Sequence, residues 1–161
     1  MARAWPEPVE RVAAFLREAA AEARVEEFSH GTPTAEAAAR AVGCEPGRIV
    51  KSLVFDCDGR SVLVMVPGDR RADARKIAAA VGCARADVAG SEQVEEATGF
   101  PPGAVAPFPL RRVERVFIER TLLAHDLVWI GAGSANHLAA VAPVELVRLA
   151  RAQPMDAVQD G

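Results

Sequence analysis

Hydrophobic positions along this chain follow a helical period in five segments and an extended period in others. Residues 9–24 place apolar side chains every three or four positions, opposite Arg and Glu, which predicts an amphipathic helix. Four more helices are predicted for the alanine-rich stretch up to Val42 and for residues 71–81, 92–98 and 144–151. The three central helices are bounded by residues that favour helix ends. The expected N-caps are Thr32, Asp69 and Ser91, and the expected C-terminal glycines are Gly43, Gly82 and Gly99.

Residues rich in β-branched side chains predict a hairpin at 49–55 and 61–66, because the Asp58-Gly59 pair between them is a strong turn signal. Further strands are predicted at 25–29, 113–118 and 127–130. Helices and strands do not alternate as βαβ units, so we expect an α+β fold with a mixed sheet, in one domain that spans residues 1–161. Residues 152–161 have little periodic apolar content, so we expect this tail to fray.

Composition excludes several classes of protein. A chain of 161 residues that is 50% hydrophobic and 25% charged can bury a core without metals or disulfides. Its apolar runs fall far short of the ~20 residues that a membrane span needs, and its N-terminal segment lacks the apolar region of a signal peptide. We therefore expect a cytoplasmic protein with no membrane partner. The net charge of -3 excludes a protein that coats DNA, but it leaves room for a few specific phosphate contacts.

The motifs and the cysteine spacing indicate which kinds of catalytic chemistry this chain can carry out. No nucleotide-binding or metalloprotease motif occurs, and no His or Cys has a partner at metal-ligand spacing, so we expect no metal and no cofactor. Three cysteines without C-x-x-C spacing are expected to be reduced, structural thiols. They are Cys44, Cys57 and Cys83. A thiol-dependent enzyme is an alternative that rests on these cysteines alone.

Lys51 is one of only two lysines among the 19 basic residues, and it interrupts an apolar strand. Such a lysine either faces solvent at a sheet edge or supplies a compact ammonium to a ligand, and both interpretations stay open. Two glycine-containing segments pose a similar choice. Residues 99–103 are either a rigid turn or a loop that presents backbone groups to a substrate. Residues 131–134 are either a strand-ending bulge or a loop whose amides bind an anion or oxyanion.

Several motifs follow one another in order along the chain. They are Lys51-Ser-Leu-Val-Phe, Val-Leu-Val-Met-Val-Pro-Gly-Asp69, the helix with Lys76-Ile-Ala, Glu92-x-x-Glu-x-x-Thr-Gly99-Phe-x-Pro-Gly103-Ala-Val-x-Pro-Phe108, and Val-Trp-x-Gly131-Ala-Gly. Together they resemble the YbaK/ProX aminoacyl-tRNA deacylase domain family. The resemblance implies a curved, barrel-like mixed sheet flanked by helices. It also implies a trans-editing hydrolase that removes alanine or cysteine from proline tRNA, with the tRNA acceptor end and prolyl-tRNA synthetase as partners.

The resemblance further implies which residues form the site. The expected catalytic residues are Lys51, Gly131 and Gly133. The expected substrate-binding residues are His30, Thr32, Gly99, Pro102, Gly103, Ala132, Ser134 and Asn136. No side-chain nucleophile is required, because an aminoacyl ester is activated and a positioned water or substrate hydroxyl can cleave it once the oxyanion is stabilised. The alternative is a non-catalytic module of the same fold that holds a tRNA end or a synthetase.

Overall fold

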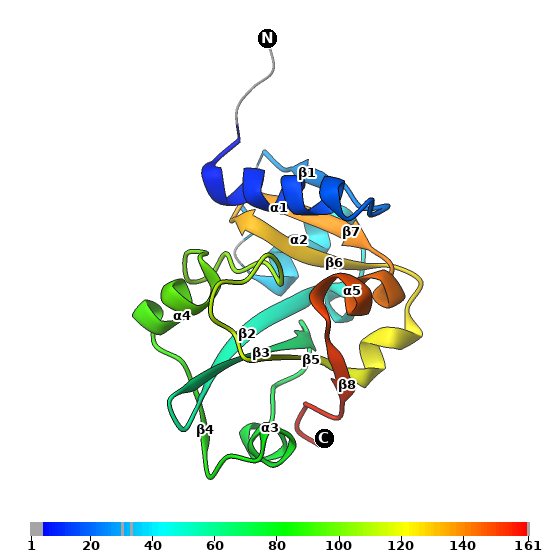
Figure 1. Cartoon of the computed structure of the whole chain (residues 1–161). Coiled ribbons are helices and arrows are strands. Elements are labelled where there is room, and N and C mark those ends of the chain that lie inside the picture. Colours follow the sequence, from blue (N-terminus) through cyan, green and yellow to red (C-terminus); the bar gives the residue numbers. More distant parts are fainter. Residues whose placement is uncertain (1–4, 30, 33, 161) are drawn as a thin grey trace.

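The computed structural model describes residues 5–29, 31–32 and 34–160, which form two β-sheets with helices packed around them (Figure 1). The smaller sheet has the strand order β1-β7-β6 and the larger has the order β4-β2-β3-β5-β8. The strands are β1 (Val25–Glu27), β2 (Val50–Cys57), β3 (Arg60–Pro67), β4 (Ala86–Val88), β5 (Arg115–Glu119), β6 (Val128–Ser134), β7 (His137–Val141) and β8 (Gln153–Met155). The helices are α1 (Glu7–Glu18), α2 (Ala35–Val42), α3 (Ala74–Val81), α4 (Ser91–Thr98) and α5 (Pro143–Ala150), with 3₁₀ turns η1 (Pro46–Arg48) and η2 (Arg120–Ala124).

The α+β class expected from the sequence is confirmed. The smaller sheet is antiparallel throughout, whereas the larger sheet is mixed because β3 pairs with β5, and β5 with β8, in parallel. What we expected as one curved sheet is thus divided in two. The sheets meet at an isolated parallel bridge between Ile49 and Trp129, next to the start of β2.

Two groups of buried apolar side chains lie on opposite faces of the larger sheet. Leu63 and Met65 of β3 face the group that fills the space between the two sheets and is covered by α1 and α5. Val62 and Val64, on alternate positions of the same strand, face the group beneath α3. Because both faces of β3 are buried, this strand reads as a continuous apolar run rather than as an alternation of apolar and polar residues.

The β2–β3 hairpin confirms the most explicit local prediction. Asp58 and Gly59 have positive φ angles of 53° and 87°, as a type I′ turn requires. The three expected C-terminal glycines are also confirmed, since Gly43, Gly82 and Gly99 all take the left-handed conformation at helix ends.

The helix starts differ from the prediction. α2 is capped by Thr34, not Thr32, because the Thr32 hydroxyl donates instead to a backbone carbonyl in the β6–β7 turn. α3 is capped by Asp73 rather than Asp69, since the chain first forms a bridge with the C-terminal segment. Ser91 is the first residue of α4 and makes no capping hydrogen bond. Polar residues close to a helix start are interchangeable as caps in sequence, and tertiary contacts decide among them.

Residues 152–160 pack against the rest of the molecule, so the expectation that residues 152–161 fray was wrong for the part of the tail that the structure describes. β8 pairs with β5, and Ala157 and Val158 are buried. The ammonium of Lys76 donates to both carboxylate oxygens of Asp156 at 3.0 and 2.9 Å and to the Val158 carbonyl at 2.8 Å. The buried carboxylate of Glu119 accepts a hydrogen bond from the Ala157 amide at 2.8 Å. These contacts come from distant parts of the chain, so the tail's own composition did not reveal them.

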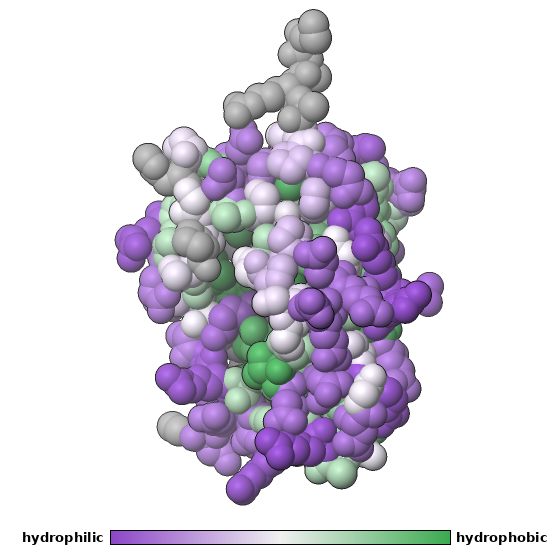
Figure 2. Space-filling model, turned by 90° about the vertical axis from the view of Figure 1, so that its left-hand side faces the viewer, coloured by the Kyte–Doolittle hydropathy of each residue, from purple (hydrophilic) through white to green (hydrophobic). Residues whose placement is uncertain are grey.

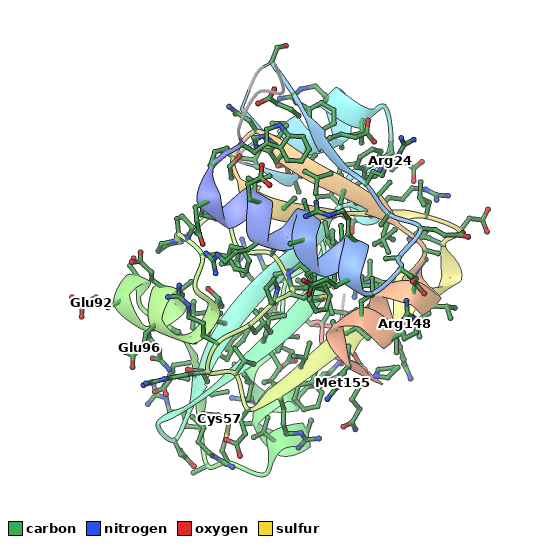
Figure 3. The ribbon with its side chains drawn as sticks, turned by 45° about the horizontal axis from the view of Figure 1, so that its top comes forward. Arg24, Cys57, Glu92, Glu96, Arg148 and Met155 are labelled. Carbon is green, nitrogen blue, oxygen red and sulfur yellow. A yellow bond between two sulfur atoms is a disulfide. The ribbon has the colours of Figure 1, made fainter. Side chains whose placement is uncertain are left out.

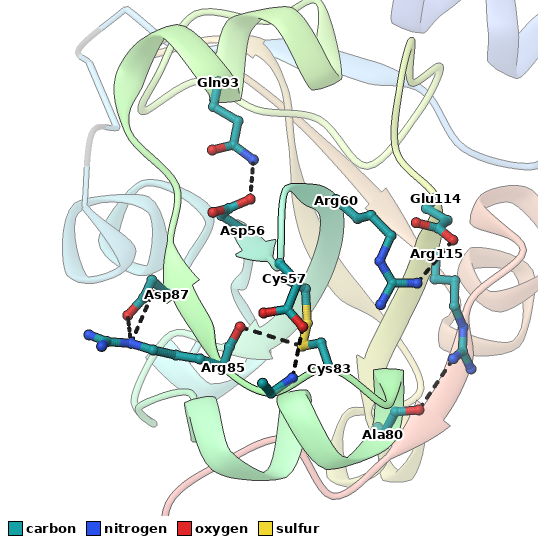
Figure 4. The surroundings of a disulfide bond; sticks show 12 residues. Asp56, Cys57, Arg60, Ala80, Cys83, Arg85, Asp87, Gln93, Glu114 and Arg115 are labelled. Atoms are coloured by element: carbon teal, nitrogen blue, oxygen red, sulfur yellow. Dashed lines mark hydrogen bonds and ion pairs between the residues drawn. A yellow bond between two sulfur atoms is a disulfide. The ribbon is translucent and has the colours of Figure 1, made fainter.

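Cys57 and Cys83 form a disulfide, which corrects the expectation that all three cysteines are reduced (Figure 4). The pairing of β4 with β2 sets Cys57 opposite Ala86, and this brings the end of α3 against the hairpin with a Cα–Cα distance of 5.9 Å. The two residues are 26 positions apart, a spacing that carries no motif. Cys44 is free, and burial is the main cause that raises the pKa of its thiol, which suits a structural role.

Candidate functional site

A cleft of about 350 Å³ lies along the open edge of β2. β4 pairs only with the last residues of β2, from Phe55 on, so in the part of the chain that the structure describes no strand pairs with this edge at residues 51–53. The walls come from this edge, the start of α2, the loop after α4, and β6. Of the predicted site residues, those that line the cleft are Thr32, Lys51, Pro102, Gly103, Gly131 and Ser134. Segments from across the chain thus meet at one place.

The surface beside α4 is partly apolar. Figure 2 views the molecule from the side on which α4 lies in Figure 1, and hydrophobic surface gathers there between hydrophilic residues. Val88, which lines the cleft, is 71% exposed. A wider groove of about 740 Å³ beside α5 contains none of the predicted site residues. The cleft at β2 is therefore the candidate site.

Lys51 reaches the cleft from β2, where it pairs in register with Val66. Its side chain is partly exposed, and its Nζ donates to the Arg70 carbonyl at 3.1 Å. Within the described ranges no carboxylate lies within ion-pair distance of this ammonium. An ammonium has three donors, so Lys51 can offer further hydrogen bonds and an uncompensated positive charge to a ligand.

Gly131 and the loop at 102–105 form a wall made of backbone. A Cβ atom on Gly131 would lie 3.0 Å from the Val105 carbonyl oxygen, so a side chain here would require this loop to move away from β6 by a few tenths of an ångström. Gly103 has a φ of +83°, and the Ala104 amide donates to the Pro101 carbonyl at 3.0 Å to close the turn. Both predicted glycine segments therefore contribute to the cleft, although residues 131–134 belong to the end of β6 rather than to a loop.

A polar network stands at the end of β6, where the β6–β7 register shifts between Gly131 and Ser134. The Ser134 hydroxyl accepts from the Asn136 amide at 3.0 Å and forms a short hydrogen bond with Nδ1 of His137. His137 is 2% exposed, and its Nε2 lies 3.3 Å from the Glu27 carboxylate. The sequence analysis missed His137, since a lone histidine carries no spacing signal. This network fixes the Ser134 side chain at the edge of the cleft.

Ser52 is a second cleft residue that the sequence analysis missed. Its hydroxyl is buried and has no hydrogen-bond partner in the part of the chain that the structure describes. The Val54 carbonyl accepts from the Ala89 amide at 3.0 Å, so Val54 directs its backbone groups to the outer edge of β2. In a strand, alternate residues direct these groups to the same side, so the N–H and C=O of Ser52 also face the cleft. The open edge can therefore bind a ligand through backbone hydrogen bonds.

Four predicted site residues lie outside the cleft lining. Gly99 ends α4, and its carbonyl accepts a hydrogen bond from Arg11. Ala132 is fully buried in the core between the sheets, and Asn136 stands in the β6–β7 turn. A Cβ atom on Gly133 would lie 2.9 Å from the backbone of Pro8, so this glycine packs against the first turn of α1. The predicted substrate residue His30 lies outside the described residues.

A sequence profile of the aminoacyl-tRNA editing domain matches residues 29–149, which is most of the chain and includes all the segments that line the cleft. The chain belongs to the aminoacyl-tRNA editing domain family. This confirms the resemblance found in the sequence. The family is related to the editing domains of prolyl-tRNA synthetases, since the chain is 38% identical over 118 residues to a proline–tRNA ligase of Nitratidesulfovibrio vulgaris.

Relatives of two sizes are similar to this editing-domain chain. The match to the Nitratidesulfovibrio ligase covers 73% of this chain but only 20% of the ligase. An uncharacterized protein of Bacillus subtilis, YwhH, is 33% identical over 76% of this chain and 78% of its own length. A crystal structure described as a proposed trans-editing enzyme for prolyl-tRNA synthetase superposes with a TM-score of 0.90 and 34% identity, over 98% of this chain and all of that one.

The helices of the described residues are all too short or too polar to cross a lipid bilayer.

Proposed function

We propose that this chain is a trans-editing hydrolase that deacylates mischarged proline tRNA, with alanine or cysteine as the amino acid removed. The observation that carries the proposal is the cleft of this editing-domain fold, which is lined by Lys51, by the edge of β2 and by Gly131, and whose lysine has no carboxylate partner in the described ranges. The similarity to the structure described as a proposed trans-editing enzyme supports an activity separate from the synthetase. We place this activity in the cytoplasm, where charged tRNA is used.

The geometry suits hydrolysis of an ester that is already activated. A water adds to the ester carbonyl carbon, gives up a proton and forms a tetrahedral oxyanion. If the substrate's 2′-hydroxyl adds first, the aminoacyl group moves to the 2′-oxygen, and water must then cleave that ester in the same way. The ammonium of Lys51 and amides of the cleft walls stabilise this charge. The bond to the ribose 3′-oxygen then breaks, and that oxygen takes up a proton. Free amino acid and a tRNA with its terminal hydroxyls are the products when water is the attacking group.

The size and lining of the cleft also support the proposal that the amino acid removed is small. Its apolar lining near α2 comes from Ala35, Ala38 and Leu138, and Gly131 closes one side. A volume of about 350 Å³ must hold the aminoacyl group together with part of the terminal ribose.

A deacylation panel tests this function. Proline tRNA charged with alanine, cysteine, serine or proline is incubated with the protein, and release of the amino acid is followed. We expect the alanyl or cysteinyl ester to be hydrolysed at least about tenfold faster than the prolyl ester, a ratio that a few contacts in a pocket can supply. A substrate that ends in 2′-deoxyadenosine separates attack by water from attack by the 2′-hydroxyl. Tight binding without hydrolysis of any ester would show the non-catalytic module instead.

A further inference from the structure

Two guanidinium groups converge at the C-terminal end of α4, just outside the cleft. Arg11 of α1 donates to the Gly99 carbonyl and lies over the Phe100 ring at 4.9 Å. A Cβ atom built on Gly99 would lie 2.7 Å from Nε of Arg111 and 2.8 Å from Nη1 of Arg11. The two cationic side chains therefore approach the same point from two different segments of the chain.

The backbone holds Arg111 at this place. The amides of Arg111 and Arg112 both donate to the Ala97 carbonyl, at 3.1 and 2.7 Å, so the chain after the 99–103 turn is anchored to the end of α4. Because this anchor is made by main-chain atoms, it holds the backbone of Arg111 beside the end of α4 whatever contacts the guanidinium makes.

Only one of the two guanidiniums has a carboxylate within ion-pair distance in the part of the chain that the structure describes. Arg11 has Glu7 as an ion-pair partner at 2.8 Å. Among the described residues, no carboxylate lies within ion-pair distance of Arg111. Two neighbouring guanidiniums with one counter-charge repel each other unless an anion lies between them, and the planar forks of arginine suit the oxygens of a phosphate.

The surroundings indicate from which side an anion can enter. Arg111 lines a shallow hollow together with Pro102 and three glutamates of α4, and Pro102 also lines the cleft. Figure 3 shows Glu92 and Glu96 projecting outward from α4. These carboxylates disfavour an anion on the outer surface of α4. An anion is therefore expected to bind between Arg11 and Arg111, on the side of the hollow where Pro102 adjoins the cleft.

We infer that Arg11 and Arg111 bind a phosphodiester of the single-stranded 3′ end of an RNA. This inference rests on the proposed function, because it is a charged RNA whose terminal ester must enter the cleft beside Pro102. The pair binds the backbone and positions the terminal nucleotide, so it contributes to RNA affinity and not to the chemical step. An overall acidic protein can bind RNA in this way, since one or two phosphates are neutralised at a defined place.

The experiment measures RNA affinity and compares two adjacent arginines. The probe is an uncharged, fluorescein-labelled acceptor-stem minihelix that ends in CCA, titrated over a series of salt concentrations. We expect Arg111→Gln to weaken binding by about five- to tenfold and to reduce the salt slope by about 0.7–1. Arg112→Gln is the matched control, because Arg112 already pairs with Glu96 at 3.2 Å and is exposed. It should bind like the wild type.

A neutral methylphosphonate, placed singly at each of the three 3′-terminal phosphodiesters, locates the contact. At one position it should weaken the wild type as much as Arg111→Gln does and have no further effect on that variant. Unchanged affinity in Arg111→Gln, or full additivity at all three positions, would overturn the inference. So would a variant that melts early yet binds normally, since the arginines would then only cap α4.

A deacylation assay distinguishes this inference from the proposed function. Arg111→Gln should raise KM and keep kcat at saturating charged RNA. If the wild type hydrolyses its substrate and Arg111→Gln binds RNA normally, the function stands and the phosphate site is wrong. If the wild type binds the minihelix through this pair but hydrolyses no ester, the phosphate site stands and the proposed function is wrong.

Discussion

Gly133 provides the sharpest test of how the cleft is built, because the structure gives it a different task from the one predicted. The family resemblance placed Gly133 among the catalytic residues, whereas in the structure this residue of β6 packs closely against the backbone of the first turn of α1. We predict that Gly133→Ala lowers stability strongly and leaves turnover per folded molecule nearly unchanged. Gly103→Ala, a second glycine with positive φ, is the matched control.

The magnitude follows from two contributions. Alanine at the φ of +101° costs about 1–3 kcal/mol in backbone strain. Its Cβ would also lie 2.9 Å from the carbonyl carbon and oxygen of Pro8 and 3.0 Å from the Val9 amide nitrogen, which are all backbone atoms at the start of a helix. Moving them disturbs Val9, which is fully buried, and adds about 1–3 kcal/mol. Together these contributions come to about 2–6 kcal/mol for Gly133→Ala.

Gly103 isolates the strain contribution, because a Cβ there meets no atom within 4 Å at a φ of +83°. Gly103→Ala should therefore cost only about 1–2 kcal/mol. The free energy of unfolding from urea titration compares the two variants, and single-turnover deacylation is normalised to the folded fraction. Equal loss of stability in both would refute the tight contact with α1. Full stability with lost turnover in Gly133→Ala would return this glycine to the catalytic site.

Three further predictions concern the disulfide, the buried carboxylate and metals. Reduction of the Cys57–Cys83 bond, or Cys83→Ser, should lower the free energy of unfolding by about 3 kcal/mol, as the 26-residue separation implies, and a thermal melt with and without dithiothreitol checks this. Burial acts to raise the pKa of Glu119, but hydrogen bonds from Thr121 and the Ala157 amide outweigh it and hold the pKa below 4.5. The ionised carboxylate of Glu119 therefore stabilises the fold above its unfolded-state pKa, and this stabilisation is lost as the pH falls through the folded-state pKa. Glu119→Gln should lower the free energy of unfolding by about 2–3 kcal/mol at neutral pH and weaken the fall in stability at acidic pH. An unchanged dependence of stability on pH in this variant would contradict this. Deacylation should survive excess EDTA, because no three His, Cys, Asp or Glu side chains in the described ranges are arranged so that they could hold a metal ion, and loss of turnover on chelation would refute it.

The elements that the sequence predicted well are those specified by local chemistry. The Asp58-Gly59 turn and the left-handed glycines after α2, α3 and α4 depend on residues that are neighbours in the chain. The elements it missed are β4, β7 and β8, of which β4 and β8 have three residues each and β7 five. Strands so short form only because a neighbouring strand offers an edge, and this is a property of the tertiary fold.

The candidate site was predicted in part for the same reason. Lys51, Pro102 and Gly131 carry ordered motifs and meet in the cleft. Ser52 adjoins Lys51 in the sequence, but its importance comes from the absence of a strand beside it, which no local pattern reveals. Motif position likewise could not separate Gly131, which faces the cleft, from Gly133, which packs against α1.

Single-turnover hydrolysis by Lys51→Ala tests the central claim most directly. The one side-chain hydrogen bond of Lys51 among the described residues goes to the Arg70 carbonyl, so the variant should fold and give the wild-type circular-dichroism spectrum. We predict that the single-turnover rate constant of Lys51→Ala is at least about a hundredfold lower than that of the wild type on the best substrate of the panel, because the ammonium that stabilises the oxyanion is lost. Lys51→Arg should restore only part of it, and Lys76→Ala, which removes the other lysine, should stay within about twofold per folded molecule. A folded Lys51→Ala protein that hydrolyses its substrate at the wild-type rate would contradict the claim.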